Sequence, residues 1–366
     1  MTKIRLAVIN NYDLERVENE VINNEVPEHL LFGTNYLRGL GHTVTFFSTT
    51  KSNKNRKHRL SNKIFSILHI NNVEVQREIF KRITEFDFIL CLCGEVSEWL
   101  YLKSLKGQIN IPILTLYHHP IPQGILDPFR NLFRKLVFCN QKKILCLSRS
   151  VASSYNRLLG KNVAESIAWG VDYEFYERIT NNKYEEKDSF LVLSCGRTSR
   201  DISTFCSAIQ IARVHGHVIC QKDQINSDIV SSKFLSIETT NYSGKTKFNT
   251  YHKMAKMIEY VRVIAIPLEK QETLAGLTSL LDCLGFGKPV IMTRNPCIDI
   301  DIEKEGIGIW VNPYDIDDWV KALKWYSENE LEAKIMGQRA KQFATQFSSR
   351  NFGERLNKTI IDHYQN

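Results

Sequence analysis

Residues 276–290 hold the side chains whose types and order point most directly to chemistry. Gly276 precedes a helical pattern and has no side chain to keep a ligand away from the backbone. Leu277 and Thr278 stand at the start of that helix, where free N–H groups and the positive end of the dipole bind phosphate. One turn further along, Asp282 is placed to accept hydrogen bonds from a ribose. We expect a nucleotide site here, although a helix and turn without a ligand would show the same pattern.

Two arginines form a second candidate phosphate site. Gly196, Arg197 and Arg200 directly follow an apolar strand pattern at 190–194 and precede a helical pattern. Guanidinium groups bind phosphate oxygens through paired hydrogen bonds, so these side chains would hold a diphosphate without a metal. For Arg200 an ion pair with Asp201 at the start of the helix is the alternative.

A pair of histidines, His118 and His119, follows another strand pattern at 113–117, ahead of a proline-rich loop. Adjacent histidines point apart and no partner ligand is evident, so we do not expect a metal site there. Asn10 and Asn11 likewise follow the strand pattern at 4–9. Ligands of open parallel sheets bind beyond the carboxyl ends of the strands, which is where all of these candidates should lie.

Short apolar runs alternate with helical patterns along the chain, as expected for parallel sheets that are covered on both faces. Strands are predicted at 4–9, 43–47, 88–93, 113–117, 144–147, 164–168, 190–194, 218–220, 234–238, 261–266, 289–293 and 308–311. Helices are predicted at 28–40, 73–84, 96–105, 151–159, 202–214, 251–260, 277–284, 315–327 and 331–347.

The polar stretch 173–187 interrupts this alternation and is interpreted as a linker. The prediction is an α/β protein with two Rossmann-like, doubly wound domains, 1–172 and 188–348, whose natural ligand site is the cleft between them. A final helix falls within 349–366.

Residues 271–290 resemble the donor-site signature of retaining glycosyltransferases of the GT-B fold, particularly family four (group 1). That signature has an acid, a glycine turn, a second acid separated from the first by seven residues, and a Gly-x-Pro-Val turn. Gly287-Lys288-Pro289-Val290 matches the turn, and Asp282 takes the place of the acid that holds the donor ribose. The first acid would fall at Leu274, so Glu272, two residues earlier, is the candidate to replace it.

The resemblance assigns further roles. It implies that Gly196 and Arg197 bind the donor diphosphate, with Arg200 in place of the family's lysine. It implies that His118 contacts the donor sugar, so that His118, Arg197 and Glu272 form the catalytic set. Asn10, Asn11 and His119 would lie on the acceptor side, 1–172 would bind the acceptor and 188–348 the donor. The helix at 349–366 would cross back to the first domain.

The reaction implied by the resemblance is transfer of a hexose from a nucleoside diphosphate sugar to a hydroxyl acceptor (a glycan, a lipid-linked compound or a small molecule), with retention. No metal and no cofactor other than this co-substrate is expected. Asp299-Ile300-Asp301 has the form of a triplet that binds a divalent metal in the other major glycosyltransferase fold, but we expect a structural role for it here.

The composition of the chain indicates its number of domains, its location and the state of its cysteines. The chain has 366 residues, 43% hydrophobic and 24% charged, which suits a folded protein of two domains. No apolar run is long enough to span a membrane, and the N-terminus does not have the pattern of a signal peptide, so we expect a cytoplasmic location. The nine cysteines form no Cys-x-x-Cys pair, so buried reduced thiols are expected.

Two basic segments account for much of the net charge of +8: residues 51–63, and residues 129–138, where cations alternate with large apolar residues. One interpretation is a solvated loop and an ordinary amphipathic helix. The other is contact with an anionic membrane or a phosphate-bearing acceptor. The second would place the protein at the cytoplasmic face of a membrane, with a glycan or lipid-linked acceptor in polysaccharide, lipopolysaccharide or glycoconjugate assembly.

Three alternatives remain open at this stage. A nucleotide-sugar 2-epimerase of the same fold would need acid and base groups such as His118, His119 and Glu272. A nucleic-acid-binding module would need aromatic residues among its cations, and residues 51–63 contain none, so no nucleic-acid partner is expected. A scaffold without activity is suggested by Leu274.

Overall fold

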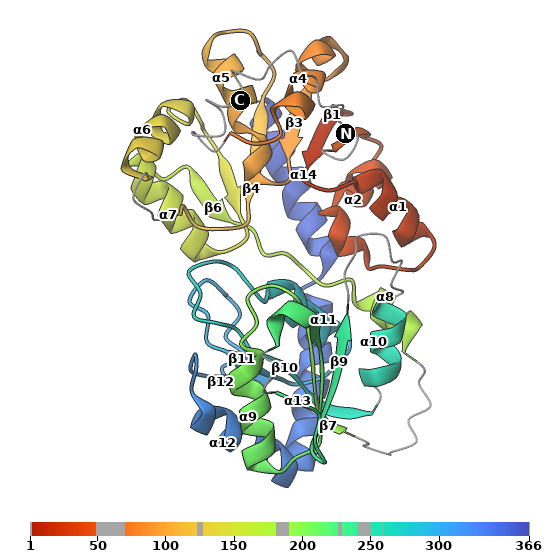
Figure 1. The fold of residues 1–366 in the computed structure, drawn as a ribbon. Helices are drawn as coiled ribbons and strands as arrows, with labels where there is room; N and C mark the ends of the chain where they lie inside the picture. The colour runs from red at the N-terminus through yellow and green to blue at the C-terminus, as the bar shows by residue number, and fades with distance from the viewer. Residues whose placement is uncertain are drawn as a thin grey trace. The chain divides into compact units, whose positions relative to one another are not determined.

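The computed structural model describes residues 2–48, 70–122, 127–180, 190–225, 229–240, 250–258 and 260–365. The chain forms two compact units (Figure 1). Unit 1 comprises Met1–Asn23, Glu28–Trp169 and Ser349–Asn366, and unit 2 comprises Asn24–Pro27 and Gly170–Ser348. No helix in the described residues is long and apolar enough to cross a membrane.

Unit 1 is built on a six-stranded parallel sheet in the order β2-β1-β3-β4-β5-β6. Its strands are β1 (Arg5–Asn10), β2 (Thr43–Ser48), β3 (Phe88–Cys91), β4 (Ile113–Tyr117), β5 (Ile144–Cys146) and β6 (Ala164–Ser166). Its helices are α1 (Leu14–Ile22), η1 (Glu28–Leu31), α2 (Thr34–Gly39), α4 (Val73–Lys81), η4 (Ile83–Glu85), η5 (Gly94–Val96), α5 (Glu98–Leu105), α6 (Asp127–Val137), α7 (Arg149–Leu159) and α14 (Ser349–Gln365).

Both faces of the unit 1 sheet are covered because side chains alternate along each strand. Ile89 and Cys91 of β3 face a core shared with Ile79 of α4 and Tyr101 of α5. Phe88 is one residue out of phase, and its ring meets His363 of α14, with 5.9 Å between the ring centroids. Helix α14 therefore belongs to the core of unit 1.

Unit 2 has a second six-stranded parallel sheet, in the order β12-β11-β10-β7-β8-β9. Its strands are β7 (Phe190–Cys195), β8 (Gly216–Gln221), β9 (Leu235–Thr240), β10 (Val261–Ile266), β11 (Val290–Thr293) and β12 (Gly308–Val311). Its helices are α8 (Tyr173–Ile179), α9 (Ile202–Ala212), η6 (Lys222–Gln224), α10 (Thr250–Ile258), α11 (Leu277–Gly285), α12 (Ile316–Glu328) and α13 (Glu330–Gln346).

The predicted strands are confirmed, each to within a few residues of its expected bounds. The helix expected at 28–40 is divided into η1 and α2, because Phe32 and Gly33 both adopt positive φ (48° and 74°). The expected linker at 173–187 begins with α8, which belongs to unit 2. The rest of that linker from residue 181 onward, and the basic segment 51–63, lie outside the described residues.

Candidate functional site

The order of the strands in unit 2 reverses between β7 and β10. From β7 the chain continues to β8 and β9 on one side, and from β10 it continues to β11 and β12 on the other. The loops that follow β7 and β10 therefore leave the sheet in opposite directions. This switch point is where open α/β sheets bind ligands, and the two loops contain most of the predicted phosphate-binding residues.

Backbone hydrogen bonds join these two loops just beyond the sheet. The N–H of Glu269 donates to the carbonyl of Ser199 (3.1 Å), and the N–H of Asp201 donates to the carbonyl of Pro267 (3.2 Å). Ser199 makes this possible by adopting a left-handed backbone, with φ of 52°. The two loops are thus held as one surface at the carboxyl edge of the sheet.

Arg200 lies buried within this surface, with only 8% of its area exposed. One terminal nitrogen donates to the carbonyl of Thr198 (2.7 Å), and the other donates to the Ser279 hydroxyl on α11 (2.7 Å). Its Nε has no hydrogen-bond partner among the described residues. Burial lowers the pKa of Arg200 to about 10, which still leaves a full positive charge at neutral pH.

Gly196 makes room for this buried guanidinium group. A Cβ at position 196 would lie 2.3 Å from the Nη2 and 2.5 Å from the Nε of Arg200. The next residue, Arg197, is exposed on the same loop. Of the two arginines expected to bind phosphate, Arg200 is therefore buried and packed under Gly196, and Arg197 is exposed beside it.

Helix α11 begins at the same edge. Its N-cap, Gly276, has φ of 87° and provides no side-chain cap. A Cβ there would meet Met292 at 2.7 Å and Leu268 at 3.0 Å. The first turn of α11 carries no acidic residue, and Thr278 is exposed there, so the positive end of the helix is not offset by a neighbouring carboxylate of its own.

Asn295, which the sequence did not single out, fixes the loop that leads into α11. This buried amide donates to the carbonyls of Thr273 and Ala275, both at 3.0 Å, and its oxygen accepts from the N–H of Cys297 at 2.9 Å. Both amide hydrogens and the oxygen are therefore used. The backbone before Gly276 is held in place without a bound ligand.

Asp282 has a partner that the sequence did not indicate. The hydroxyl of Tyr176 on α8 donates to Oδ1 of Asp282 at 2.5 Å. Burial raises the pKa of Asp282 to about 7, although the hydrogen bond from Tyr176 and the charge of Arg200 both act in the opposite direction. Near neutral pH this carboxyl group is therefore divided between its protonated and ionised forms.

The raised pKa of Asp282 predicts how stability changes with pH. An acid that holds its proton more tightly when folded makes the free energy of unfolding fall as the pH rises, here from about 4 to about 7. Asp282→Asn keeps the Oδ1 that accepts from Tyr176 but cannot ionise. We expect this variant to gain stability relative to the wild type between about pH 4.5 and pH 8.

Urea unfolding at several pH values measures this difference. Asp317→Asn is a matched control, because Asp317 is an exposed carboxylate on α12 of the same unit. Its stability should follow that of the wild type at each pH. Parallel profiles for Asp282→Asn and the wild type would contradict the assigned pKa.

In unit 1, Asn10 ends β1 and His118 follows β4, both at the carboxyl edge of the sheet. His118 stacks on Phe32 with 5.1 Å between ring centroids and has a backbone hydrogen bond with Leu92. Burial lowers the pKa of His118 to about 4, so the ring is neutral at pH 7. In the described residues, Nε2 of His118 and Nδ2 of Asn10 are both buried without a hydrogen-bond partner, whereas Asn11 and His119 are exposed.

Comparison with solved structures places this arrangement among known folds. A glycosyltransferase from Rickettsia africae superposes with a TM-score of 0.72 at 16% identity over 100% of both chains. An α,α-trehalose-phosphate synthase (UDP-forming) from Burkholderia vietnamiensis gives 0.69 at 12% over 98% of this chain and 100% of its own. Anabaena HepE, in complex with UDP and glucose, gives 0.62 at 11% over 98% and 100%. The fold is GT-B.

The predicted fold class is thereby confirmed. No protein-family model matches the sequence, and no curated protein matches it either. At these identities the likeness concerns the fold alone.

The GT-B chain differs from the expected signature at the first acid. Leu274 is buried, with 7% of its area exposed, and packs within the loop that Asn295 holds. Glu272 is exposed on that loop, two residues earlier. Replacement of the missing acid by Glu272 stays a prediction.

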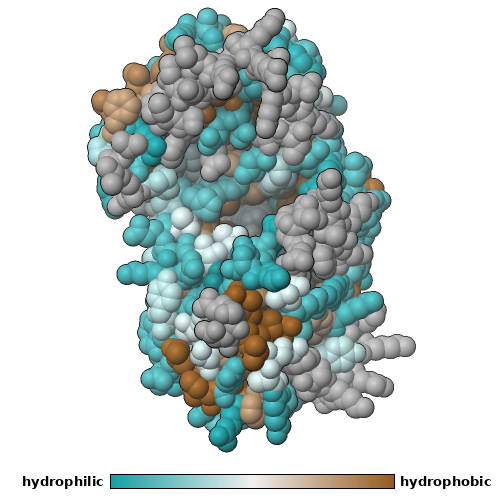
Figure 2. Space-filling view, viewed as in Figure 1, coloured by the Kyte–Doolittle hydropathy of each residue, from teal (hydrophilic) through white to brown (hydrophobic). Residues whose placement is uncertain are grey.

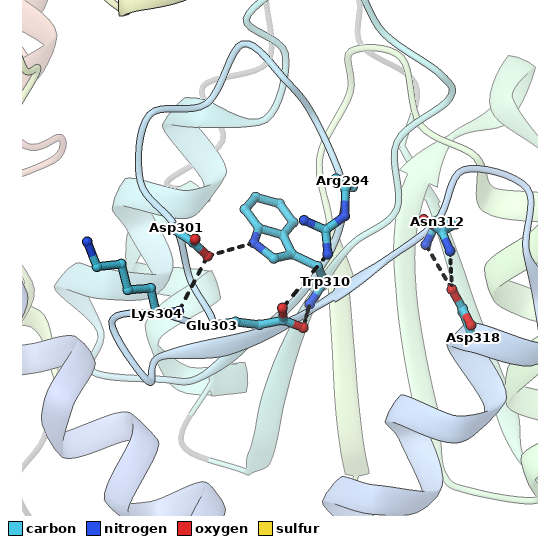
Figure 3. Close-up of polar contacts among 7 residues, drawn as sticks. All are labelled: Arg294, Asp301, Glu303, Lys304, Trp310, Asn312 and Asp318. Carbon is cyan, nitrogen blue, oxygen red and sulfur yellow. Dashed lines mark hydrogen bonds and ion pairs between the residues drawn. The ribbon is translucent and has the colours of Figure 1, made fainter.

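The triplet at 299–301 participates in a local network rather than in a cluster of acids (Figure 3). Asp301 accepts from the indole N–H of Trp310 at 3.2 Å, and this hydrogen bond lowers its pKa. Arg294 lies over the Trp310 ring, 5.6 Å from its centroid, and forms an ion pair with Glu303 at 3.8 Å. Within the described ranges, no group of three or more histidine, cysteine or acidic side chains is arranged to hold a metal ion.

Proposed function

We propose that this protein is a glycosyltransferase that uses a nucleoside diphosphate sugar and binds the diphosphate at the switch point of unit 2. The observation that carries the proposal is the buried guanidinium group of Arg200, which hydrogen-bonds to Ser279 in the first turn of α11. The ion pairs of the described residues do not include Arg200, although the charge of Asp282 acts on it from a greater distance. Helix α11 adds the positive end of its dipole. A buried positive potential of this kind favours an anion.

The neighbouring groups suit the remaining parts of a nucleotide. Arg197, exposed beside Gly196, can bind the second phosphate, and Thr278 adds a hydroxyl at the start of α11. The ionised form of Asp282 can accept a hydrogen bond from a ribose hydroxyl through the oxygen that Tyr176 does not occupy. Two structural neighbours, one UDP-forming and one in complex with UDP, make uridine the base that we propose.

The reaction that we propose proceeds with retention. The acceptor oxygen forms a bond to the anomeric carbon on the face from which the diphosphate departs, the bond from that carbon to the diphosphate oxygen breaks, and the hydroxyl proton passes to the diphosphate. Arg197 and Arg200 stabilise the charge that develops on the leaving group, a task that fixed donors perform effectively in a site with little water. No metal is required for this step.

The proposed contact between His118 and the donor sugar is supported by the chemistry of its ring. A neutral imidazole whose Nε2 has no partner in the described part of unit 1 can accept a hydrogen bond from a sugar hydroxyl. Asn10, with a buried amide nitrogen in the same condition, can donate one. Both groups suit a neutral hydroxylated ligand.

Thermal melting with a panel of nucleotides tests the donor proposal. UDP at about 100 times its Kd should stabilise the folded state by about 2.7 kcal/mol and raise the Tm by several degrees. CMP, which has one phosphate, should raise it much less because only one of the two arginine contacts can form. A panel of UDP, GDP, ADP and TDP that leaves the Tm unchanged would contradict the proposal.

A further inference from the structure

Three large apolar side chains are exposed on helix α6 of unit 1. Phe129, Leu132 and Leu136 have 64%, 67% and 60% of their areas in solvent. Because they are three and four residues apart, they lie on one face of the helix. Figure 2 shows apolar atoms gathered at the upper left of the surface, where Figure 1 places α6. The helix is anchored in the core of unit 1 by Val137, which is fully buried, and by Phe133, which is partly buried.

The exposed positive charge beside this apolar face comes from Lys135. Arg130 and Arg134 lie on the inner side of the helix with 16% and 14% of their side chains exposed, 3.7 and 3.6 Å from the same carboxylate oxygen of Asp127. Asp127 is the only acid in α6. The helix thus combines an exposed apolar stripe with a net positive charge, as helices that lie in the surface of an anionic membrane do.

The exposed area of the stripe favours a lipid surface over a protein as its binding partner. Three side chains exposed to this extent offer on the order of 350 Å², less than half of the ~800 Å² that each partner buries in a stable protein interface. A lipid surface requires no such area, since each inserted side chain contributes separately and each cation adds attraction to acidic head groups.

We propose that α6 is the contact through which this protein binds an anionic membrane surface, with Phe129, Leu132 and Leu136 inserted among the acyl chains and Lys135 at the level of the head groups. The proposal depends on unit 1 alone and is independent of the donor site. Failure of the vesicle-binding experiment would therefore leave the proposed transfer reaction unaffected, and the reverse is also true.

Co-sedimentation of the full chain with vesicles provides the test. The wild type should bind vesicles of phosphatidylcholine that contain about a third phosphatidylglycerol, and bind pure phosphatidylcholine at least about tenfold more weakly. Leu132→Ser should weaken binding about tenfold, and Lys135→Gln about fivefold. The triple variant Phe129→Ser, Leu132→Ser, Leu136→Ser should lose binding altogether. Because these side chains are exposed, the melting temperature should not fall in any of the variants.

Two serine substitutions elsewhere serve as matched controls. Ile22 on α1 and Leu331 on α13 are as exposed as the α6 residues, at 74% and 66%, but are not part of the stripe. Ile22→Ser and Leu331→Ser should bind anionic vesicles as the wild type does. A loss of binding in either control equal to that of Leu132→Ser would overturn the assignment to α6.

Cys139 supplies a second measurement close to the helix. It is the one exposed thiol among the nine cysteines and lies two residues after α6. A polarity-sensitive dye on Cys139 should shift to shorter wavelength with anionic vesicles and not with neutral ones. The proposal is overturned if the wild type does not bind anionic vesicles, if the triple variant binds as well as the wild type, or if the stripe instead holds a dimer that the triple variant dissociates.

Discussion

Arg197→Ala should raise the Kd of UDP by about 10- to 100-fold and lower the rate of sugar transfer by about 100-fold or more. Arg197 is exposed directly after Gly196 at the switch point, where its guanidinium group can bind phosphate oxygens bidentately. Because the side chain is exposed, its removal should leave the melting temperature within about a degree of the wild type. Calorimetric titration with UDP measures the affinity without knowledge of the acceptor.

Arg294→Ala is the matched control for this prediction. Arg294 is another exposed arginine at the carboxyl edge of the same sheet, but it follows β11 and is engaged with Trp310 and Glu303 (Figure 3). Its removal should change the Kd of UDP by less than about twofold. If both variants lose affinity equally, the diphosphate is held by the general charge of this edge rather than by Arg197.

Gly285→Ala should destabilise the protein by about 1–3 kcal/mol. A Cβ at position 285 would lie 2.2 Å from Cδ2 and 2.5 Å from Cε2 of the Tyr176 ring. That ring is fully buried and packs edge-on against Phe286, with 4.7 Å between centroids, so it has no space to retreat. Its displacement would also break the hydrogen bond to Asp282. Denaturant unfolding followed by tryptophan fluorescence measures the loss.

Gly39→Ala is the control for the added methyl group. Gly39 lies in α2, and a Cβ there would meet no atom within 4 Å, so the variant should be neutral or slightly stabilised. A double-mutant cycle with Tyr176→Ala should show that the cost of Gly285→Ala largely disappears once the ring is gone. Additive effects of the two substitutions would place the cause of the destabilisation elsewhere.

The sheets could be predicted because their central strands, such as β3 and β4, are apolar on both faces, a local property of a few consecutive residues. Helix α8 could not, since in its seven residues only Phe175 and Tyr176 turn inward and the rest are polar or half-exposed. The break at Phe32 could not be foreseen either. The Phe32 ring stacks on Trp169 at 4.8 Å, a contact that no pattern near residue 32 indicates.

In the candidate site, too, the features set by neighbouring residues could be predicted, whereas contacts between distant residues could not. Gly196, Arg197 and Gly276 were expected at the ends of strands and the start of a helix, which depends on local order alone, and they lie there. Two contacts that shape the site could not be predicted, because they join residues 79 and 106 positions apart: Arg200 to Ser279, and Tyr176 to Asp282. A buried polar network of this kind becomes visible only when the packing is known.

Unit 1 contains residues from both ends of the chain, and this affects the order in which the two units can fold. The segment Gly170–Ser348 holds the whole sheet of unit 2, whereas the sheet of unit 1 lacks one of its covers until α14 has been added. Phe352, Leu356 and Ile360 of that helix are buried at 2%, 0% and 0% exposure, so without them an apolar face of unit 1 stands open to water. During translation, the unit that leaves the ribosome first is consequently the one that is completed last.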